Sequence, residues 1–277
     1  DLQSAVRSTG CVEAWVAKGV YKPGVVTSDS FQPRAGVKLY GGFAGTETSV
    51  AQRTASVIAA NPTVLSGDID GNDNTDANSV VLDAAQIAGS NSTNVVLMNN
   101  GGSAGYGTDT VIDGFIITAG DGGSGGMGGG LRCDASLAQP HCDITLSNLV
   151  FSGNRAGGGG ALSLSSSSGT ANAVVSKVLF RGNRAIGPGA SGGAVILAAT
   201  PAAGQVKPAF INVIFSGNSS QNWGGAVDLN VNLGTVMPTF DNATFTGNFS
   251  SVQRGGAIAS QAYGTGGVAR ATFYNSI

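Results

Sequence analysis

The feature that most constrains the fold of this chain is a pair of short sequence blocks that recur together about every thirty residues. The first block is Phe-x-Gly-Asn, and the second, a few residues later, is Gly-Gly-Ala. The first block begins at Phe151, Phe180, Phe215 and Phe245, and the second begins at Gly159, Gly192, Gly224 and Gly255. Two markers that advance with one period indicate a solenoid, in which each repeat forms one coil.

The composition of the repeats favours strands over helices. Only 11% of the 277 residues are charged and 45 are glycine, whereas helical repeats are rich in Ala, Leu, Glu and Lys at helical spacing. The segments between the blocks are short β-branched and aromatic runs, as in 173–180 and 210–215, which are typical of strands. The pattern predicts an all-β fold, a single-stranded parallel β-helix (solenoid), with about nine coils.

Stacking of the coils would turn each recurring residue into a column along the solenoid axis. The recurring Phe is predicted to form an internal aromatic stack. The Asn of the same block is expected at a corner, where Asn tolerates left-handed backbone and its amide both donates and accepts hydrogen bonds. A second corner column is expected three residues before each Phe, at Asn148, Lys177, Asn212 and Asn242. The Gly-Gly pair is expected at a further corner that excludes a Cβ atom.

Side chains after each Gly-Gly-Ala block alternate between two faces. In the first such strand Leu162 and Leu164 are expected to point inward, because successive side chains of a strand point to opposite faces. The outward column between them is predicted to contain Ser163, Ile196, Asp228 and Ala259. These four residues have no functional group in common, so this column is not predicted to be a binding or catalytic site.

The whole chain, 1–277, is predicted to be one domain, with less regular coils in 1–113 and regular repeats in 114–277. From Phe273 onward the chain starts a fifth Phe block without completing it. Because open strand edges are normally capped, we expect the sequence to be a fragment of a longer protein. For the same reason we expect self-association through the coil ends.

Two cysteines are candidates for a disulfide. Cys133 and Cys142 flank a short loop that contains Pro140 and His141, and a bond between them would staple this loop in a secreted protein. The alternative is a pair of buried thiols.

A dense polar segment precedes the regular repeats and is the candidate metal site. Oxygen-bearing side chains occur at every second position, at Asp68, Asp70, Asn72, Asn74 and Asp76, and Ca²⁺ prefers such oxygen ligands. The segment is not an EF-hand, because Gly71 is fourth rather than sixth and no Glu follows at the twelfth position. The alternative to a calcium loop is a turn whose Asp and Asn side chains bind their own backbone.

Three arginines are the candidate ligand-binding residues. Arg155 and Arg184 each follow the Asn of a Phe block, and Arg181 lies nearby. Stacked guanidinium groups would attract an anionic glycan. The alternative is that they occupy solvated corners.

Catalysis remains an alternative, as a polysaccharide lyase or a glycoside hydrolase. A hydrolase needs two carboxyl groups about 5 to 9.5 Å apart, and acids are sparse in the repeats. Asp228 and Asp241 are near in sequence, but the alternation places them on different sides. No catalytic residue is therefore predicted.

Charge and hydropathy argue against two further classes of protein. The net charge is −2 and no cluster of Lys and Arg is present, so nucleic-acid binding is not expected. The most apolar windows are too short and interrupted to span a bilayer.

The repeated Phe-x-x-Asn and Gly-Gly-Ala-Ile/Val pair resembles the repeats of chlamydial polymorphic outer-membrane proteins and, more broadly, those of right-handed parallel β-helix proteins of bacterial surfaces. This resemblance implies that the β-helix is right-handed. The segments 14–23, 37–47 and 63–71 are similar to the opening coils of large secreted β-helix proteins that carry C-terminal sorting or anchoring domains. The resemblance covers nearly the whole chain. It implies export, display at the outer membrane or cell surface, and contact with polysaccharide, cell-surface glycan or protein.

We therefore expect an extracellular, surface-displayed β-helix that acts as an adhesin-like binding segment or a stalk, without catalysis. The alternatives are a carbohydrate-active enzyme or its accessory domain, and a self-assembling surface-layer or filament component.

Overall fold

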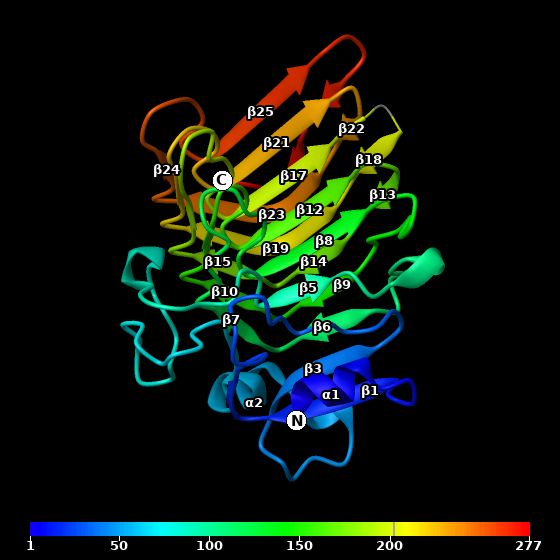
Figure 1. Ribbon diagram of the computed structural model, residues 1–277, viewed down its shortest axis with the longest axis vertical. Coiled ribbons are helices and arrows are strands. Elements are labelled where there is room, and N and C mark those ends of the chain that lie inside the picture. The colour runs from blue at the N-terminus through cyan, green and yellow to red at the C-terminus, as the bar shows by residue number, and fades with distance from the viewer. Residues whose placement is uncertain (202) are drawn as a thin grey trace.

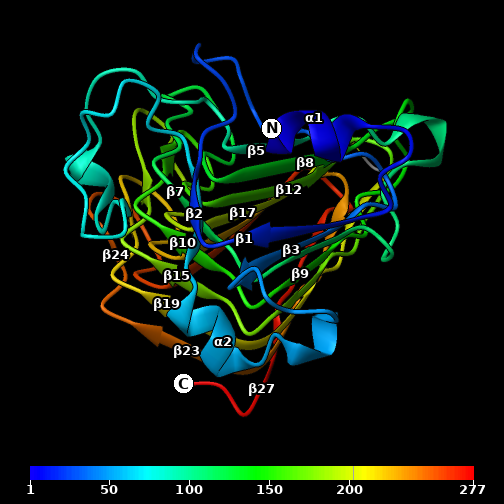
Figure 2. The ribbon, with the colours of Figure 1, turned by 90° about the horizontal axis from the view of Figure 1, so that it is seen from below.

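The chain winds into a parallel β-solenoid with its coils stacked along the long axis of the molecule (Figure 1). The computed structural model describes residues 1–201 and 203–277. Every strand pair is parallel. An end-on view shows the sheets around a common interior (Figure 2). The predicted all-β parallel β-helix is confirmed.

The largest sheet has 13 strands and bends to form two sides of each coil. The first side consists of β1 (Glu13–Ala17), β3 (Lys38–Phe43), β6 (Val111–Asp113), β9 (Thr145–Ser147), β14 (Val174–Ser176) and β27 (Thr272–Tyr274). The second side consists of β2 (Gly19–Tyr21), β4 (Thr63–Ser66), β7 (Ile116–Thr118), β10 (Val150–Ser152) and β15 (Leu179–Arg181). Two longer strands, β19 (Ala209–Ser216) and β23 (Thr239–Thr246), run through both sides.

A six-stranded sheet forms the third side and faces the viewer in Figure 1. It contains β5 (Val96–Met98), β8 (Leu131–Ala135), β12 (Leu162–Ser166), β17 (Val195–Ala199), β21 (Val227–Asn232) and β25 (Ile258–Tyr263). One four-stranded sheet consists of β11 (Arg155–Ala156), β16 (Arg184–Ala185), β20 (Ser219–Ser220) and β24 (Phe249–Ser250). The other consists of β13 (Gly169–Ala171), β18 (Gly204–Val206), β22 (Thr235–Val236) and β26 (Val268–Ala269).

Helices are short and belong to the N-terminal half. They are α1 (Leu2–Arg7), α2 (Ala55–Ala60) and the 3₁₀ turns η1 (Val50–Gln52), η2 (Ala84–Gln86) and η3 (Gly102–Ala104). None of the helices in the described part of the chain combines the length and apolar character needed to cross a bilayer.

The number of coils is smaller than predicted. The solenoid makes about five turns rather than nine. The prediction assumed that every coil uses about thirty residues, but the N-terminal coils contain long excursions. For example, β3 ends at Phe43 and its neighbour β6 begins only at Val111.

The core contains the predicted phenylalanine stack. Phe151, Phe180, Phe215 and Phe245 stack in order with centroid separations of 5.1, 4.8 and 4.8 Å and nearly parallel rings. A second stack, which the repeats did not predict, runs beside it through Phe210, Phe240 and Phe273. The rings of the two stacks meet at steep angles, and such tilted arrangements are favourable for aromatic pairs.

The Asn residues of the Phe blocks form a hydrogen-bonded ladder. Asn154 N and Nδ2 both donate to Asn183 Oδ1 at 3.0 Å, and the pattern repeats from Asn183 to Asn218 and from Asn218 to Asn248. The expected left-handed backbone does not lie at this Asn. It lies one residue earlier, at the Gly of the block, with φ between 57° and 62°. The glycine makes the bend, and the buried amide satisfies the backbone around it.

The predicted outward column, Ser163, Ile196, Asp228 and Ala259, is nevertheless buried. The turn before each strand folds over its first outward residue. The turns of successive coils pair with one another through Met127, Gly158, Ser191 and Trp223. The next residue is glycine in each of these turns, and a Cβ atom on Gly159 would lie 2.8 Å from Ile196 Cγ2, so these glycines allow the close cover.

Candidate functional site

The outer face of the six-stranded sheet carries a row of partly exposed side chains along the solenoid axis. The row consists of Asp134, Ser165, Ala198, Asn230 and Gln261, which are direct neighbours on β8, β12, β17, β21 and β25. We call it the axial row. Ser165, Ala198, Asn230 and Gln261 each lie two positions after a member of the buried outward column, beyond the cover of the turns. Asp134 lies two positions after Arg132, which is itself partly exposed. With about 4.8 Å between strands, the row extends over roughly 19 Å.

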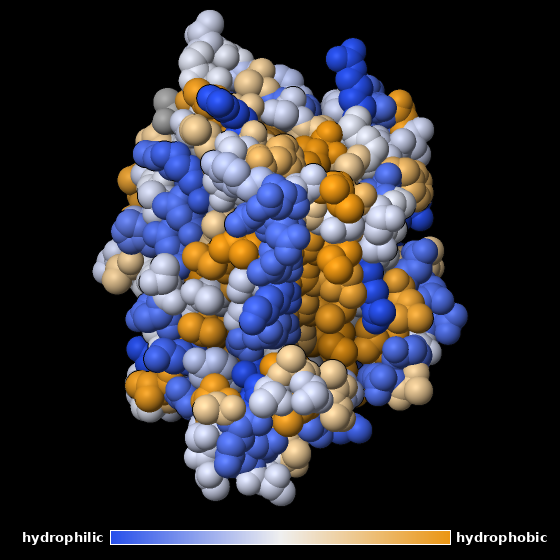
Figure 3. All heavy atoms as spheres, turned by 180° about the vertical axis from the view of Figure 1, so that it is seen from behind, coloured by the Kyte–Doolittle hydropathy of each residue, from blue (hydrophilic) through white to orange (hydrophobic). Residues whose placement is uncertain are grey.

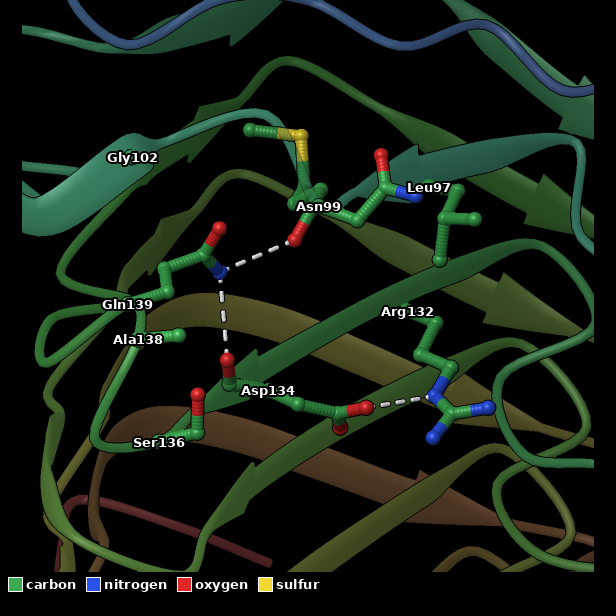
Figure 4. Close-up of a pocket in the computed structure, with 9 residues that line it drawn as sticks. Leu97, Asn99, Gly102, Arg132, Asp134, Ser136, Ala138 and Gln139 are labelled. Atoms are coloured by element: carbon green, nitrogen blue, oxygen red, sulfur yellow. Dashed lines mark hydrogen bonds and ion pairs between the residues drawn. The ribbon is translucent and has the colours of Figure 1, made fainter.

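A cavity of about 540 Å³ opens at the N-terminal end of the axial row. Figure 4 shows Arg132 and Asp134 on one side of it and Asn99 and Gln139 on the other. Its lining contains both hydrogen-bond donors and acceptors, together with apolar side chains such as Leu97. Such a mixture is typical of ligand sites, in which a few polar groups set the orientation of the ligand.

Arg132 and Asp134 form an ion pair within this cavity. Arg132 Nε donates to Asp134 Oδ2 at 2.6 Å, and Ser165 Oγ donates to Asp134 Oδ1 at 2.6 Å. The two charged side chains remain 41% and 33% exposed, and an exposed pair contributes little to stability. In the described part of the chain the Nη atoms of Arg132 have no acceptor. The pair therefore presents oriented donors and acceptors to a ligand.

Gln139 holds the wall opposite the ion pair in place, and a disulfide holds the strand of the ion pair. Gln139 Nε2 donates to the carbonyl oxygens of Met98 and Asp134 at 3.0 and 3.1 Å. Cys133 and Cys142 form a disulfide with their Cα atoms 6.1 Å apart. Because Cys133 lies between Arg132 and Asp134 on β8, the disulfide anchors the strand that carries the ion pair.

A second hollow of about 540 Å³ lies at the C-terminal end of the same face, around Trp223, Arg254, Gln261 and Tyr263. Tyr263 Oη donates to Gln261 Oε1. Gln261 Nε2 in turn donates to Asp228 Oδ1 at 2.9 Å. The Gln261 side chain thus connects a solvent-exposed phenol to a buried carboxyl group.

Asp228 is fully buried beneath the turn that precedes its strand. Burial raises the pKa of its carboxyl group, and hydrogen bonding to Gln261 opposes this effect. Oδ2 has no geometric hydrogen-bond partner among the described residues. Asp241, the other acid near it in sequence, lies in a different sheet on β23, as the alternation indicated.

The axial row was not predicted from the sequence, because the alternation of inward and outward side chains was followed only to the first outward position of each strand. The signal was present: Asp134, Ser165, Asn230 and Gln261 are polar residues at one repeated position. The alternation of side chains does not show which of the outward positions the turns cover.

The three candidate arginines lie away from this face. Arg155 and Arg184 are neighbours on β11 and β16. Arg155 Nη2 donates to Asp121 Oδ2 at 2.7 Å, and this carboxylate raises the pKa of the guanidinium. Arg184 is exposed, and Arg181 Nε donates to Ser152 Oγ at 3.0 Å. Since one charge is already neutralised, two free guanidinium groups remain for the predicted anionic glycan.

The loop that contains Asp68, Asp70, Asn72, Asn74 and Asp76 is held by its own backbone. Asp68 accepts hydrogen bonds from the backbone N–H groups of residues 71 and 72, and Asp76 accepts them from residues 78 and 80. Asp70 and Asp73 accept one each, from the backbone N–H groups of residues 90 and 88. Partial burial raises the pKa of Asp73. Within 1–201 and 203–277, no three His, Cys, Asp or Glu side chains are grouped to hold a metal. Calcium binding here stays a prediction.

Two segments of the chain, 148–165 and 212–229, match the family model described as Chlamydia polymorphic membrane protein (Chlamydia_PMP) repeat. Each match starts at a corner Asn and runs through the Phe-x-Gly-Asn and Gly-Gly-Ala blocks. No curated protein and no solved structure gives a significant match. The chain is thus a parallel β-solenoid with two segments similar to the Chlamydia polymorphic membrane protein repeat, a repeat family associated with the bacterial outer membrane or surface.

Proposed function

We propose that this chain is a surface-displayed segment of a bacterial outer-membrane-associated or secreted protein, and that it binds an extended glycan along the axial row without catalysis. The matched repeat family supports a surface location. The observation that carries the binding role is the cavity at Arg132 and Asp134, which continues into the axial row, where every side chain except that of Ala198 is polar. An adhesin-like role follows if the glycan belongs to another cell.

The chemistry of the row favours a neutral or weakly charged polymer. Arg132 donates, Asp134 accepts, and the amides of Asn230 and Gln261 do both, which suits hydroxyl groups that also do both. The Arg132–Asp134 pair is close to neutral as a unit. A linear array over several coils matches a repeating chain better than a single small molecule.

A glycan array followed by titration calorimetry tests this proposal. Replacing Arg132 by Ala removes charge-assisted hydrogen bonds worth about 1.5 to 3 kcal/mol, so the affinity for a bound polysaccharide should decrease roughly ten- to hundredfold. The matched control is Arg184→Ala, an exposed arginine on another side, which should leave the affinity unchanged. Loss of affinity in the control alone would instead favour the arginines first indicated by the sequence.

Absence of binding to every polysaccharide would exclude a glycan ligand and favour a structural stalk. Self-association through the coil ends remains a separate prediction, and sedimentation of the purified chain tests it.

A further inference from the structure

A row of apolar side chains runs along the opposite face of the solenoid. Ile116, Val150, Leu179 and Ile214 are direct neighbours on β7, β10, β15 and β19 and point outward. We call them the apolar row. Figure 3 shows hydrophobic surface forming a strip along the axis on this face. Ile214 is 45% exposed. Single exposed apolar residues are ordinary, but a contiguous row indicates an interaction surface.

The polar corner column runs beside the apolar row and contains one exception. Asn148, Asn212 and Asn242 adopt left-handed backbone, with φ between 51° and 55°. Lys177 adopts the same conformation, with φ of 54°, although left-handed backbone favours Asn, Asp and Gly. In the described part of the chain its Nζ has no hydrogen-bond or ion-pair partner. A strained residue without an internal role is a candidate for function.

The side chain of Lys177 borders the hollow above the apolar row. This hollow of about 330 Å³ is lined by Lys177, Leu179 and Ile214, among others. Arg181, on the same strand as Leu179, adds a second positive charge nearby. Asp113, the acid close to this corner, is already paired with Arg53. Lys177 therefore carries an unpaired positive charge beside the apolar row, whereas Asp83 lies next to Arg181, because a Cβ atom on Gly182 would come within 3.2 Å of Asp83 Cα, and Asp241 directly precedes Asn242 of the corner column.

One end of the apolar row is covered by a helix of the chain itself. At this end Ile58 and Ala59 of α2 border a hollow together with Ile116 and Val150, and the larger hollow above the row is bordered on its α2 side by Ala55, Ile58 and Ala59. These residues have the i, i+3, i+4 spacing that places side chains on one helix face. The remaining part of the row, toward Ile214, has no such cover. The protein thus shows what kind of element fits against this surface.

The spacing of the row also suits a helix that lies along the solenoid axis. Apolar side chains recur about every 4.8 Å from strand to strand, and a helix rises about 5.4 Å per turn. Over the two steps from Val150 to Ile214 the mismatch is only about 1 Å. An added strand does not fit here, because the row is a sheet face and strand addition requires a sheet edge.

We propose that the apolar row is a docking surface for an acidic amphipathic helix of a partner protein. The helix continues along the row from α2, places its apolar face on Val150, Leu179 and Ile214, and places acidic residues against Lys177 and Arg181. This interaction does not depend on the proposed glycan binding, because the two surfaces lie on opposite faces.

The proposal is tested with a fluorescent peptide of about 18 residues, which is long enough to form a helix in isolation. It carries Ala, Ile and Leu at i, i+3, i+4 and i+7 and Glu on both flanks. Fluorescence anisotropy should show binding to the wild-type chain. A second peptide with Lys in place of Glu should bind at least fivefold more weakly.

Two substitutions locate the surface without a risk to folding. Lys177→Asn introduces the residue that the column otherwise uses, and it should weaken binding of the acidic peptide about fivefold. Ile214→Ser removes exposed apolar surface and should weaken it about tenfold. Lys207→Asn, an exposed lysine elsewhere in the chain, is the matched control and should change nothing.

Three results would overturn the proposal. The first is equal binding of the acidic and basic peptides, or binding of neither. The second is a dimer in sedimentation that Ile214→Ser dissociates, since the occupant would then be a second copy. The third is an Ile214-dependent association with phosphatidylglycerol vesicles in the absence of peptide binding, which would indicate a lipid surface.

Discussion

The regular coils of 114–277 and the irregular coils of 1–113 are stabilised in different ways. In the regular part each internal residue contacts its own equivalents: Phe180 stacks between Phe151 and Phe215, and Asn183 bonds to Asn154 and Asn218. One structural solution is repeated from coil to coil. Stability there is approximately a sum over neighbouring coils.

The irregular part depends on contacts that occur once. Arg53 forms a buried ion pair with Asp113, and their side chains are 4% and 10% exposed. Arg53 also donates to Gly41 O and lies over the rings of Tyr40 and Phe43. This single residue ties the excursion between β3 and β6 to the sheet. The regular coils are stabilised by many equivalent contacts, whereas the irregular coils depend on a few contacts that each occur once.

The largest effect is expected from breaking the phenylalanine column. Phe180→Ala leaves a cavity between two rings and should lower the free energy of unfolding by about 3 to 5 kcal/mol, as measured by chemical denaturation. Phe249→Ala is the matched control: Phe249 is 55% exposed and its loss should cost less than about 0.5 kcal/mol. Equal effects of the two substitutions would contradict the stacking argument.

The next effect is expected from the ion pair of the irregular part. Arg53→Met leaves Asp113 as a buried, unpaired charge and should lower stability by about 3 kcal/mol. Hydrogen exchange should accelerate in 38–66 and stay unchanged in 195–262. Arg53→Met combined with Asp113→Asn should recover part of the loss. Equal acceleration of hydrogen exchange in both regions would contradict the proposed difference in how they are stabilised.

A smaller effect is expected from Asp228, the buried acid of the regular part. Its pKa is raised by burial, so the folded state favours the protonated carboxyl group. Stability is therefore greatest below the unfolded pKa and decreases as the pH rises through the raised value. Asp228→Asn should remove this dependence and stabilise the protein at neutral pH by about 1 to 3 kcal/mol.

Denaturation of both forms at pH 4 and pH 7 measures the Asp228 effect. The difference between wild type and variant should be larger at pH 7 than at pH 4. A variant that is less stable than wild type at pH 7 would show that the ionised carboxylate is well satisfied in the folded state.

The smallest effect is expected from calcium at the loop 68–76. A site with a Kd of about 1 mM would add about 1.4 kcal/mol of stability at 10 mM Ca²⁺. Calorimetry should then show heat for the wild type and less for Asp70→Asn, with Asp109→Asn, outside the loop, as control. Absence of heat in the wild type would show that these carboxylates bind only their hydrogen-bond partners within the protein.

The regular coils were predicted well because their geometry repeats with the sequence. The Phe column and the Asn ladder follow directly from the period, since stacked coils place equal positions one above another. The second Phe stack, at Phe210, Phe240 and Phe273, was overlooked because it begins only in the later repeats. The left-handed bend was assigned to Asn rather than to the preceding Gly because both residue types tolerate it.

The irregular coils and the candidate site were predicted less well, because they depend on contacts between distant segments. Nothing in the period reveals that 44–62 and 67–95 are long excursions before β4 and β5, so the count of nine coils was too high. Nor does local sequence show that Arg155 meets Asp121 or that Arg53 meets Asp113. These pairs form only when separate coils come together.

The sequence by itself determined the parallel solenoid, its Phe core and its Asn ladder, because interstrand hydrogen bonding converts a period in the chain into columns in space. Tertiary structure alone decided which outward positions are open. The glycine turns cover Ser163 and Asp228 and leave Asp134 and Gln261 accessible. The physical reason is that a turn can approach a strand only where no Cβ atom intervenes, and that approach is set by the fold of the whole coil.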